Sequence, residues 1–171
     1  MNTAAVLKAA RFAAEAHKYQ KRKGEAKRPY IVHPLRVAEI VAAHSELDST
    51  IAVIAALLHD VIEDTGYDYR DIEGVFGSEV AELVNEVTFI NKDKDAKIAR
   101  APSLSPKAKA IKVADLVANL EDLTEDRDAF TPENRLRYVN YAIAMKDAMG
   151  PVGYYLDGVF DNAVLNFFKE I

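Results

Sequence analysis

The stretch Ile51–Asp64, IAVIAALLHDVIED, decides the fold. Eight consecutive apolar residues open it, and its polar residues gather at its end: His59, Asp60, Glu63 and Asp64. The apolar run predicts a buried helix, because no face of it can be exposed to water cheaply. A helix C-terminus carries partial negative charge, which disfavours carboxylates there. Polar groups at this end of a core helix need a compensating positive charge, and a bound metal ion is the simplest source.

Composition limits the classes of protein that this chain can be. Its 171 residues are 50 % hydrophobic and 29 % charged, which is ordinary for one globular domain spanning 1–171. The net charge of −5 argues against binding to nucleic acid or to an anionic membrane. The chain contains no Cys, which excludes disulfides, thiolate zinc sites and cysteine nucleophiles.

The apolar runs also argue against a membrane protein. The longest is far shorter than the roughly 20 residues of a membrane helix. Charges at Lys8, Arg11 and Glu15 interrupt the first segment where a signal peptide would be apolar. We therefore expect a soluble, cytoplasmic protein. The sequence leaves the oligomeric state open and is compatible with a homo-oligomer.

The hydrophobic spacing is helical nearly throughout, and strand signals are almost absent, so the predicted fold class is all-α. Residues 91–104 are predicted to form a surface loop. Cap residues followed by Pro mark two helix starts, at Ser105-Pro106 and Thr131-Pro132. The remaining predicted helices cover residues 3–19, 34–44, 49–64 (capped by Asp48 or Ser49), 69–76, 79–89 and 152–168.

Residues that bind metals recur beside the apolar helices. On a continuous helix His59 and Glu63 share one ridge, and Asp60 and Asp64 share the next. The same spacing relates Asp115 to Asn119 in KVADLVANL, and His33 stands at a predicted helix start. Each feature alone is more often structural, and we interpret His17 and His44 as structural. Together, two His and two Asp suit manganese, iron, zinc or another divalent metal, with positions left for water.

A basic segment, HKYQKRKGEAKR at 17–28, is the second feature. It contains six Lys or Arg residues and one Glu within an acidic protein. An isolated charge run is more often a solvated loop. The alternative is an anion site, since Lys supplies a point charge to phosphates and Arg can also stack on a base. The segment leads to His33, and further lysines precede Asp115, so we expect a phosphorylated substrate.

His33, the His59-Asp60 pair and Asp115 resemble the signature of the HD-domain superfamily of metal-dependent phosphohydrolases. More narrowly, the chain resembles the (p)ppGpp hydrolase domain of RelA/SpoT homologues, especially the small stand-alone hydrolases. The similar stretches lie between Phe12 and Leu123: FAAEAHKYQKRKG, RPYIVHPLRVAEIV, AALLHDVIEDT, FGSEVAELVNEVT and AKAIKVADLVANLEDL. The resemblance implies one compact multi-helix HD hydrolase domain with the metal site between its central helices.

The resemblance also implies a role for each matching residue. Its implied ligands for one Mn²⁺ are His33, His59, Asp60 and Asp115. Glu63 and Asp64 would position and deprotonate the attacking water. The implied contacts to the guanine nucleotide are Arg22, Lys23, Lys112, Asn119 and Arg135, with Arg22 stacking on the base. Past Leu123 the similarity weakens, and Glu121 stands where the family pattern NLRDL has a basic residue.

The implied activity is hydrolysis of the 3′-pyrophosphate of ppGpp or pppGpp to GDP or GTP and pyrophosphate. One alternative is another HD phosphohydrolase activity, such as a nucleotidase or an NADPH phosphatase. A second is a non-catalytic nucleotide-binding HD protein, against which the complete ligand set, Glu63 and Asp64 argue. We further expect the C-terminal end of the 51–64 helix to loosen first without metal.

Overall fold

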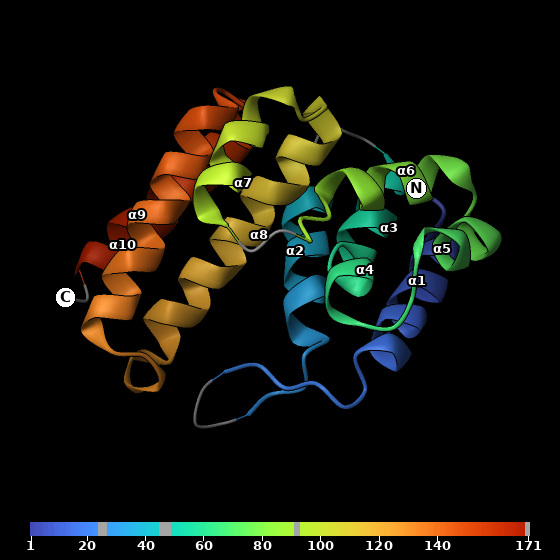
Figure 1. Cartoon of the computed structure of the whole chain (residues 1–171), viewed down its shortest axis with the longest axis horizontal. Helices are drawn as coiled ribbons and strands as arrows, with labels where there is room; N and C mark the ends of the chain where they lie inside the picture. The colour runs from blue at the N-terminus through green and yellow to red at the C-terminus, as the bar shows by residue number, and fades with distance from the viewer. Residues whose placement is uncertain (24–26, 45–48, 91–92, 170–171) are drawn as a thin grey trace.

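Helices make up the regular structure of the chain, as predicted (Figure 1). The computed structural model describes residues 1–23, 27–44, 49–90 and 93–169. Within these ranges the only pairing of extended chain is an isolated bridge between Lys21 and Pro29. The α-helices are α1 (Thr3–Ala16), α2 (Val32–Ala43), α3 (Thr50–Leu58), α4 (Val61–Asp64), α5 (Tyr69–Phe76), α6 (Ser78–Val87), α7 (Lys94–Arg100), α8 (Pro106–Glu125), α9 (Pro132–Met149) and α10 (Tyr154–Lys169).

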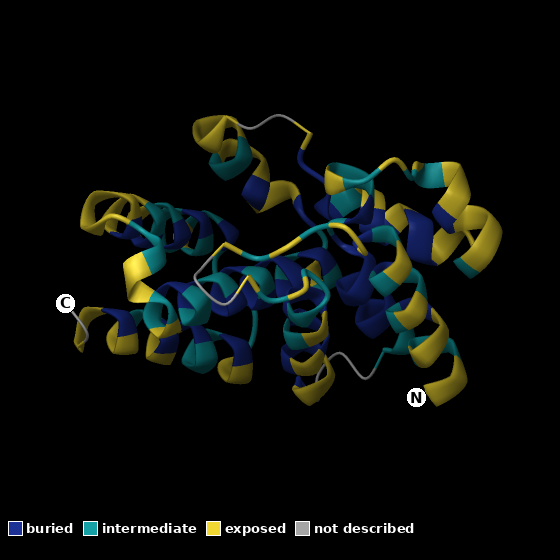
Figure 2. Ribbon diagram, turned by 90° about the horizontal axis from the view of Figure 1, so that it is seen from below, coloured by how far each residue is buried: buried dark blue, intermediate teal, exposed yellow. Residues whose placement is uncertain are grey.

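Helix α8 runs through the middle of the molecule (Figure 1). Helices α9 and α10 lie on one side of it, and α2 and α3 lie on the other. The apolar helix α3 packs against α1, α2, α6 and α8. Its residues 52–58 are all buried. Figure 2 shows the buried residues of the molecule in dark blue. The apolar run therefore forms the centre of the core, because burying it removes a large apolar area from water.

Two predicted helix starts are confirmed in detail. The side chain of Ser105 accepts a hydrogen bond from Ala108 N at 3.3 Å, with Pro106 as the first residue of α8. Thr131 caps α9 in the same way, ahead of Pro132. A Pro at this position loses no helical bond, because the first amide groups of a helix have no partner within it. The cap at Ser49 is also confirmed, whereas Asp48 lies outside the described residues.

The predicted continuous helix 49–64 is wrong. Helix α3 ends at Leu58, a turn follows at His59 and Asp60, and α4 begins at Val61. The backbone of Asp60 relaxes to φ −97° and ψ −5°. On one continuous helix, side chains of successive residues point about 100° apart. Across this turn, Asp60 Oδ2 lies 3.0 Å from His59 Nε2.

The predicted loop 91–104 is also wrong in its described part. It contains α7 and a short 3-10 helix, Ala101–Ser103. Asp93 caps α7 by accepting a hydrogen bond from Asp95 N at 3.0 Å. At the other end, Arg100 donates to the backbone oxygens of Thr88 and Glu86 at the end of α6. These polar contacts add to the packing of Ile98 against the core, because the helix has no fully buried residue.

Two helix ends differ from the prediction near the site. Helix α1 ends at Ala16, so His17 caps it. Helix α2 begins at Val32, and His33 therefore lies within its first turn. Among the described helices, none is both long and apolar enough to cross a membrane.

Candidate active site

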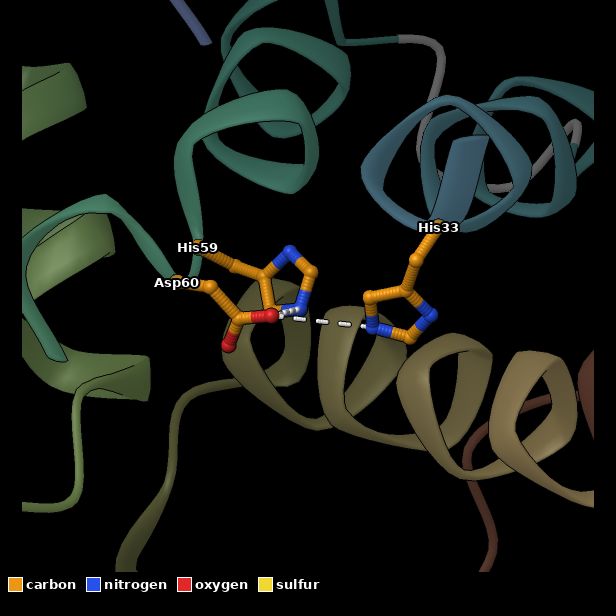
Figure 3. A group of neighbouring side chains, drawn as sticks. All are labelled: His33, His59 and Asp60. Carbon is orange, nitrogen blue, oxygen red and sulfur yellow. Dashed lines mark ion pairs between the residues drawn. The ribbon is translucent and has the colours of Figure 1, made fainter. Parts of the chain in front are cut away.

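Three ligand-type side chains meet between the central helices (Figure 3). His33 comes from α2, whereas His59 and Asp60 come from the turn after α3. Their ligand atoms all lie within 4.8 Å of one another. Asp60 Oδ2 is 3.0 Å from His59 Nε2 and 3.6 Å from His33 Nε2. These three residues form a compact nitrogen and oxygen donor set.

Asp115 on α8 completes the set that the sequence predicted. Its Oδ1 lies 3.1 Å from His33 Nε2 and 3.7 Å from His59 Nε2. The two imidazoles thus lie between two carboxylates, one from each side of the cluster. We call these four residues the metal cluster: His33, His59, Asp60 and Asp115.

The chemistry of the metal cluster fits a divalent cation. His59 Nδ1 donates to the backbone oxygen of Ala56 at 2.8 Å, so in the neutral imidazole the lone pair is on Nε2. That Nε2 is buried and lies 3.0 Å from Asp60 Oδ2 and 3.7 Å from Asp115 Oδ1. A hydrogen bond from the other ring nitrogen, like that of Nδ1 to Ala56 O, orients a metal-binding imidazole and fixes its tautomer. With two oxygen and two nitrogen donors, the cluster suits manganese, iron or zinc.

The electrostatics of the cluster point to the same conclusion. Burial alone would lower the pKa of His59, but Asp60 and Asp115 outweigh it and raise this pKa to about 10. Burial would raise the pKa of Asp115, yet Lys112, His33 and His59 hold it well below its usual range. The pKa of Asp60 is likewise lowered, mainly by His59, against the effect of burial. Two carboxylates that are only 14 % and 13 % exposed therefore require positive charge, which a proton supplies when no metal is bound.

Three further side chains hold the carboxylates of the cluster. Lys112 Nζ donates to Asp115 Oδ2 at 2.9 Å, and Asn119 Nδ2 donates to Asp115 Oδ1 at 2.7 Å. The hydroxyl of Tyr30 donates to Asp60 Oδ2 at 2.8 Å. It also lies 3.3 Å from Asp64 Oδ2, so Tyr30 joins a cluster residue to one of the candidate catalytic carboxylates.

Glu63 and Asp64 have different surroundings. Glu63 accepts a hydrogen bond from Phe89 N at 3.0 Å, and Lys97 Nζ lies 3.4 Å from its other oxygen. Asp64 is exposed, and partial burial of its carboxyl group together with the charges of Asp60 and Glu63 raises its pKa. A raised pKa suits a general base. Asp64 N donates to Asp60 O at 2.9 Å, so Asp64 follows Asp60 of the cluster by one helical turn.

A cavity of about 490 Å³ opens beside Asp64. Its lining combines cations from the segment before α2 with polar and aromatic groups from α8 and α9. The lining residues are Lys21, Arg22, Lys23, Tyr30, Asp64, Asn119, Asp122, Leu123, Phe130 and Tyr138. The volume lies within the range of small-ligand sites. A charged cavity next to a metal cluster is suited to a phosphorylated ligand.

Comparison with known proteins agrees with this site. The HD domain family matches residues 9–134, which include the whole metal cluster. This chain belongs to the HD domain family.

Relatives of this HD protein carry a specific name. Guanosine-3′,5′-bis(diphosphate) 3′-pyrophosphohydrolase MESH1 of Xenopus tropicalis is 37 % identical over an alignment of 171 positions. The alignment covers 96 % of each chain. MESH1 of Homo sapiens is 38 % identical over 139 residues, which cover 78 % of each chain. A solved structure described as a metazoan orthologue of SpoT that hydrolyses ppGpp has a TM-score of 0.88. Its sequence is 32 % identical to this one, and the match covers 95 % of each of the two chains. The resemblance inferred from the sequence is therefore confirmed.

The structure brings most of the predicted substrate residues of this HD protein to the cavity. Arg22, Lys23 and Asn119 line it. Lys112 does not; it is buried against Asp115 beside the metal cluster. Arg135 is also buried, with its guanidinium carbon 5.1 Å from the centre of the Phe167 ring, and it is not among the lining residues.

Sequence reasoning missed four residues of the site: Tyr30, Lys97, Asp122 and Tyr138. Asp122 follows Asn119 by three positions and Asp115 by seven on α8, so helical spacing carried a usable signal for it. Tyr30 precedes His33 by three positions, which is a weaker signal. His17, interpreted as structural, stacks on Tyr30 with ring centres 4.7 Å apart. Nothing local marks Lys97 or Tyr138, because tertiary contacts alone bring them to the site.

Proposed function

We propose that this protein hydrolyses the 3′-pyrophosphate of ppGpp or pppGpp, producing GDP or GTP and pyrophosphate. The observation that carries the proposal is the position of Asp64. This carboxylate lines the basic cavity and lies 3.3 Å from the Tyr30 hydroxyl that binds Asp60 of the metal cluster. A nucleotide in the cavity would present its phosphates where the cluster and the carboxylates meet. The names of the MESH1 relatives support this substrate.

The chain's own residues would divide the chemistry between them. Asp64, assisted by Glu63, would orient the attacking water and take its proton. The water oxygen would bond to the phosphorus attached to the ribose O3′, and the bond from that phosphorus to O3′ would break. Arg22 and Lys23 would hold the nucleotide and offset its negative charge, while Asn119 would contact it. Positioning and charge compensation are most of what phosphoryl transfer requires of a protein.

We propose that His33, His59, Asp60 and Asp115 bind one Mn²⁺. When bound, such an ion lowers the pKa of a coordinated water and neutralises charge on the phosphorus. The lysine contact to Asp115 and the tyrosine contact to Asp60 would keep both carboxylates oriented toward it.

The wider expectations complete the proposal. We propose that residues 1–171 form a single HD hydrolase domain whose ligand is a small guanine nucleotide. The predicted lack of nucleic-acid partners, the compatibility with a homo-oligomer and the cytoplasmic location stay predictions.

One assay tests the activity. The purified protein is incubated with ppGpp and Mn²⁺, with and without a chelator, and both pyrophosphate and inorganic phosphate are measured. We expect pyrophosphate release that the chelator stops. Inorganic phosphate released from NADPH or nucleoside monophosphates, without pyrophosphate from ppGpp, would favour the other phosphohydrolase activities. Metal binding without turnover of any nucleotide would favour a non-catalytic protein.

A further inference from the structure

The cations of the cavity come from one extended segment, which we call the basic arm (residues 20–23 and 27–30). Its two stretches pair through the Lys21–Pro29 bridge. Arg22 N donates to Arg28 O at 2.9 Å, and Tyr30 N donates to Gln20 O at 3.2 Å. Two stretches with so few backbone bonds are not stable alone in water. Contacts with the helices must therefore hold the arm in place.

One carboxylate on α8 binds both arginines of the arm. Asp122 Oδ2 accepts from Arg22 Nε at 2.7 Å and lies 2.6 Å from Arg22 Nη2. Asp122 Oδ1 accepts from Arg28 Nη2 at 2.8 Å. The two oxygens thus hold one arginine from each stretch. Arg28 also lies 3.5 Å from Glu125, but that carboxylate is mostly exposed and contributes little.

We propose that Asp122 is a positioning residue that holds the basic arm against α8 and sets Arg22 in the cavity. This proposal rests on the proposed function. Arg22 Nη2 also donates to Asn119 Oδ1 at 2.6 Å, so the two substrate residues are bonded to each other. An incoming nucleotide must compete for that bond, whereas the bond of Arg22 to Asp122 can persist. Asp122 therefore keeps the guanidinium in the cavity while Asn119 is released to the ligand.

Charge gives Asp122 a second effect on the arm. Arg22 and Arg28 approach the same carboxylate, and Lys21 and Lys23 lie beside them in the sequence. Without a negative charge between them, the two guanidinium groups would repel each other. The Arg22 side chain is only 13 % exposed, so water screens this repulsion poorly. Loss of the Asp122 charge should therefore displace the two arginines of the arm.

The role predicts a specific kinetic result. Asp122 has no contact with the metal cluster, so its loss should change substrate binding rather than the chemical step. The Asp122→Asn variant keeps the size of the side chain but loses its charge. We expect its KM for ppGpp to rise about tenfold, which corresponds to about 1.4 kcal/mol, with kcat within about twofold of wild type.

Arg28 allows a sharper test, because it does not line the cavity. If Asp122 acts through the arm, Arg28→Ala should also raise KM, by about threefold, although the residue does not line the cavity. The double variant should resemble Asp122→Asn alone, because both changes remove the ion pair between Asp122 and Arg28. The matched control is Glu133→Gln, which breaks a pair with Arg137 at 2.9 Å on the exposed face of α9. Its KM should equal that of wild type.

Hydrogen exchange measures the arm independently of turnover. In Asp122→Asn and Arg28→Ala, the amides of Arg22 and Tyr30 should exchange faster than in wild type and in Glu133→Gln. If the wild type releases no pyrophosphate, the proposed function fails, and exchange still tests the role of Asp122. Unchanged exchange in Asp122→Asn overturns the role of Asp122, as does a fall in kcat at unchanged KM.

Discussion

The metal cluster and the basic arm lie side by side but are held by different forces. The cluster comes from α2, α8 and the turn after α3, and both of its histidines are buried. Apolar packing of those helices fixes its geometry. The basic arm is extended chain, held mainly by ion pairs and hydrogen bonds to α8 and to the turn. Packed helices thus hold the residues proposed to bind metal, whereas polar contacts hold the segment proposed to bind the substrate.

The largest effect should come from removing a carboxylate of the cluster. Asp60→Ala and Asp115→Ala should each abolish metal binding and lower activity by roughly a thousandfold or more, because each removes one of the four proposed donors and one of the two negative charges that would offset the cation. Metal content and pyrophosphate release measure this. Arg22→Ala is the matched control from the arm and should keep its metal. Equal metal loss in Arg22→Ala would mean that the two regions do not act separately.

Next in size is the loss of the candidate base. Glu63→Gln and Asp64→Asn should lower kcat by about a hundredfold or more, because each removes a proton acceptor without removing a cluster residue. Metal content should stay at the level of wild type. A fully active Glu63→Gln variant would remove Glu63 from the proposed chemistry.

Tyr30 belongs to the arm yet binds the cluster, so it tests the boundary between them. Tyr30→Phe removes the hydrogen bond to Asp60 and should weaken metal affinity by about tenfold, as expected for the partner of a ligand. Titration with Mn²⁺ measures the affinity. Tyr69→Phe is the control, since its hydroxyl donates to the surface residue Glu73 at 3.4 Å. An unchanged affinity in Tyr30→Phe would assign Tyr30 to the arm alone.

The smallest effect concerns pH and the metal-free protein. The folded-state pKa of His59 is raised to about 10, from an ordinary value of 6.5. Its protonation therefore stabilises the metal-free fold fully below about pH 6.5, and this stabilisation is lost as pH rises toward 10. The Tm of the metal-free protein should fall by roughly 5 °C or more across this window. The Mn²⁺-loaded protein should change less, and a flat metal-free profile would contradict the assigned charge state.

The sequence predicted the cluster better than its surroundings. An apolar run ending in His59 and Asp60 specifies a buried helix end, and the resemblance supplied His33 and Asp115. The turn after Leu58 was missed because the backbone angles of His59 and Asp60 both remain in the helical region. The interruption between α3 and α4 therefore does not alter the helical spacing of apolar residues from which the helix was predicted.

One sequence does not show which face of a helix is buried. The predicted substrate residues Lys112 and Arg135 are both buried and are not among the residues that line the cavity, and their roles stay predictions. Helix α7 has no apolar stripe, and its end contacts with α6 depend on the folded structure. The sequence does not distinguish Asp122 from other acidic residues, because its ion pairs with Arg22 and Arg28 form only in the folded structure.

The origin of the cluster residues has a consequence for chain topology. His33, His59 and Asp115 are widely separated in sequence: α2 and α3 intervene in one interval, and α4 to α7 in the other. An ion bound by all three would close two loops of the chain, as a removable cross-link would. Closing loops restricts the conformational entropy of partly opened states. Metal should therefore slow global unfolding, as well as preventing the loosening of the helix end that carries His59.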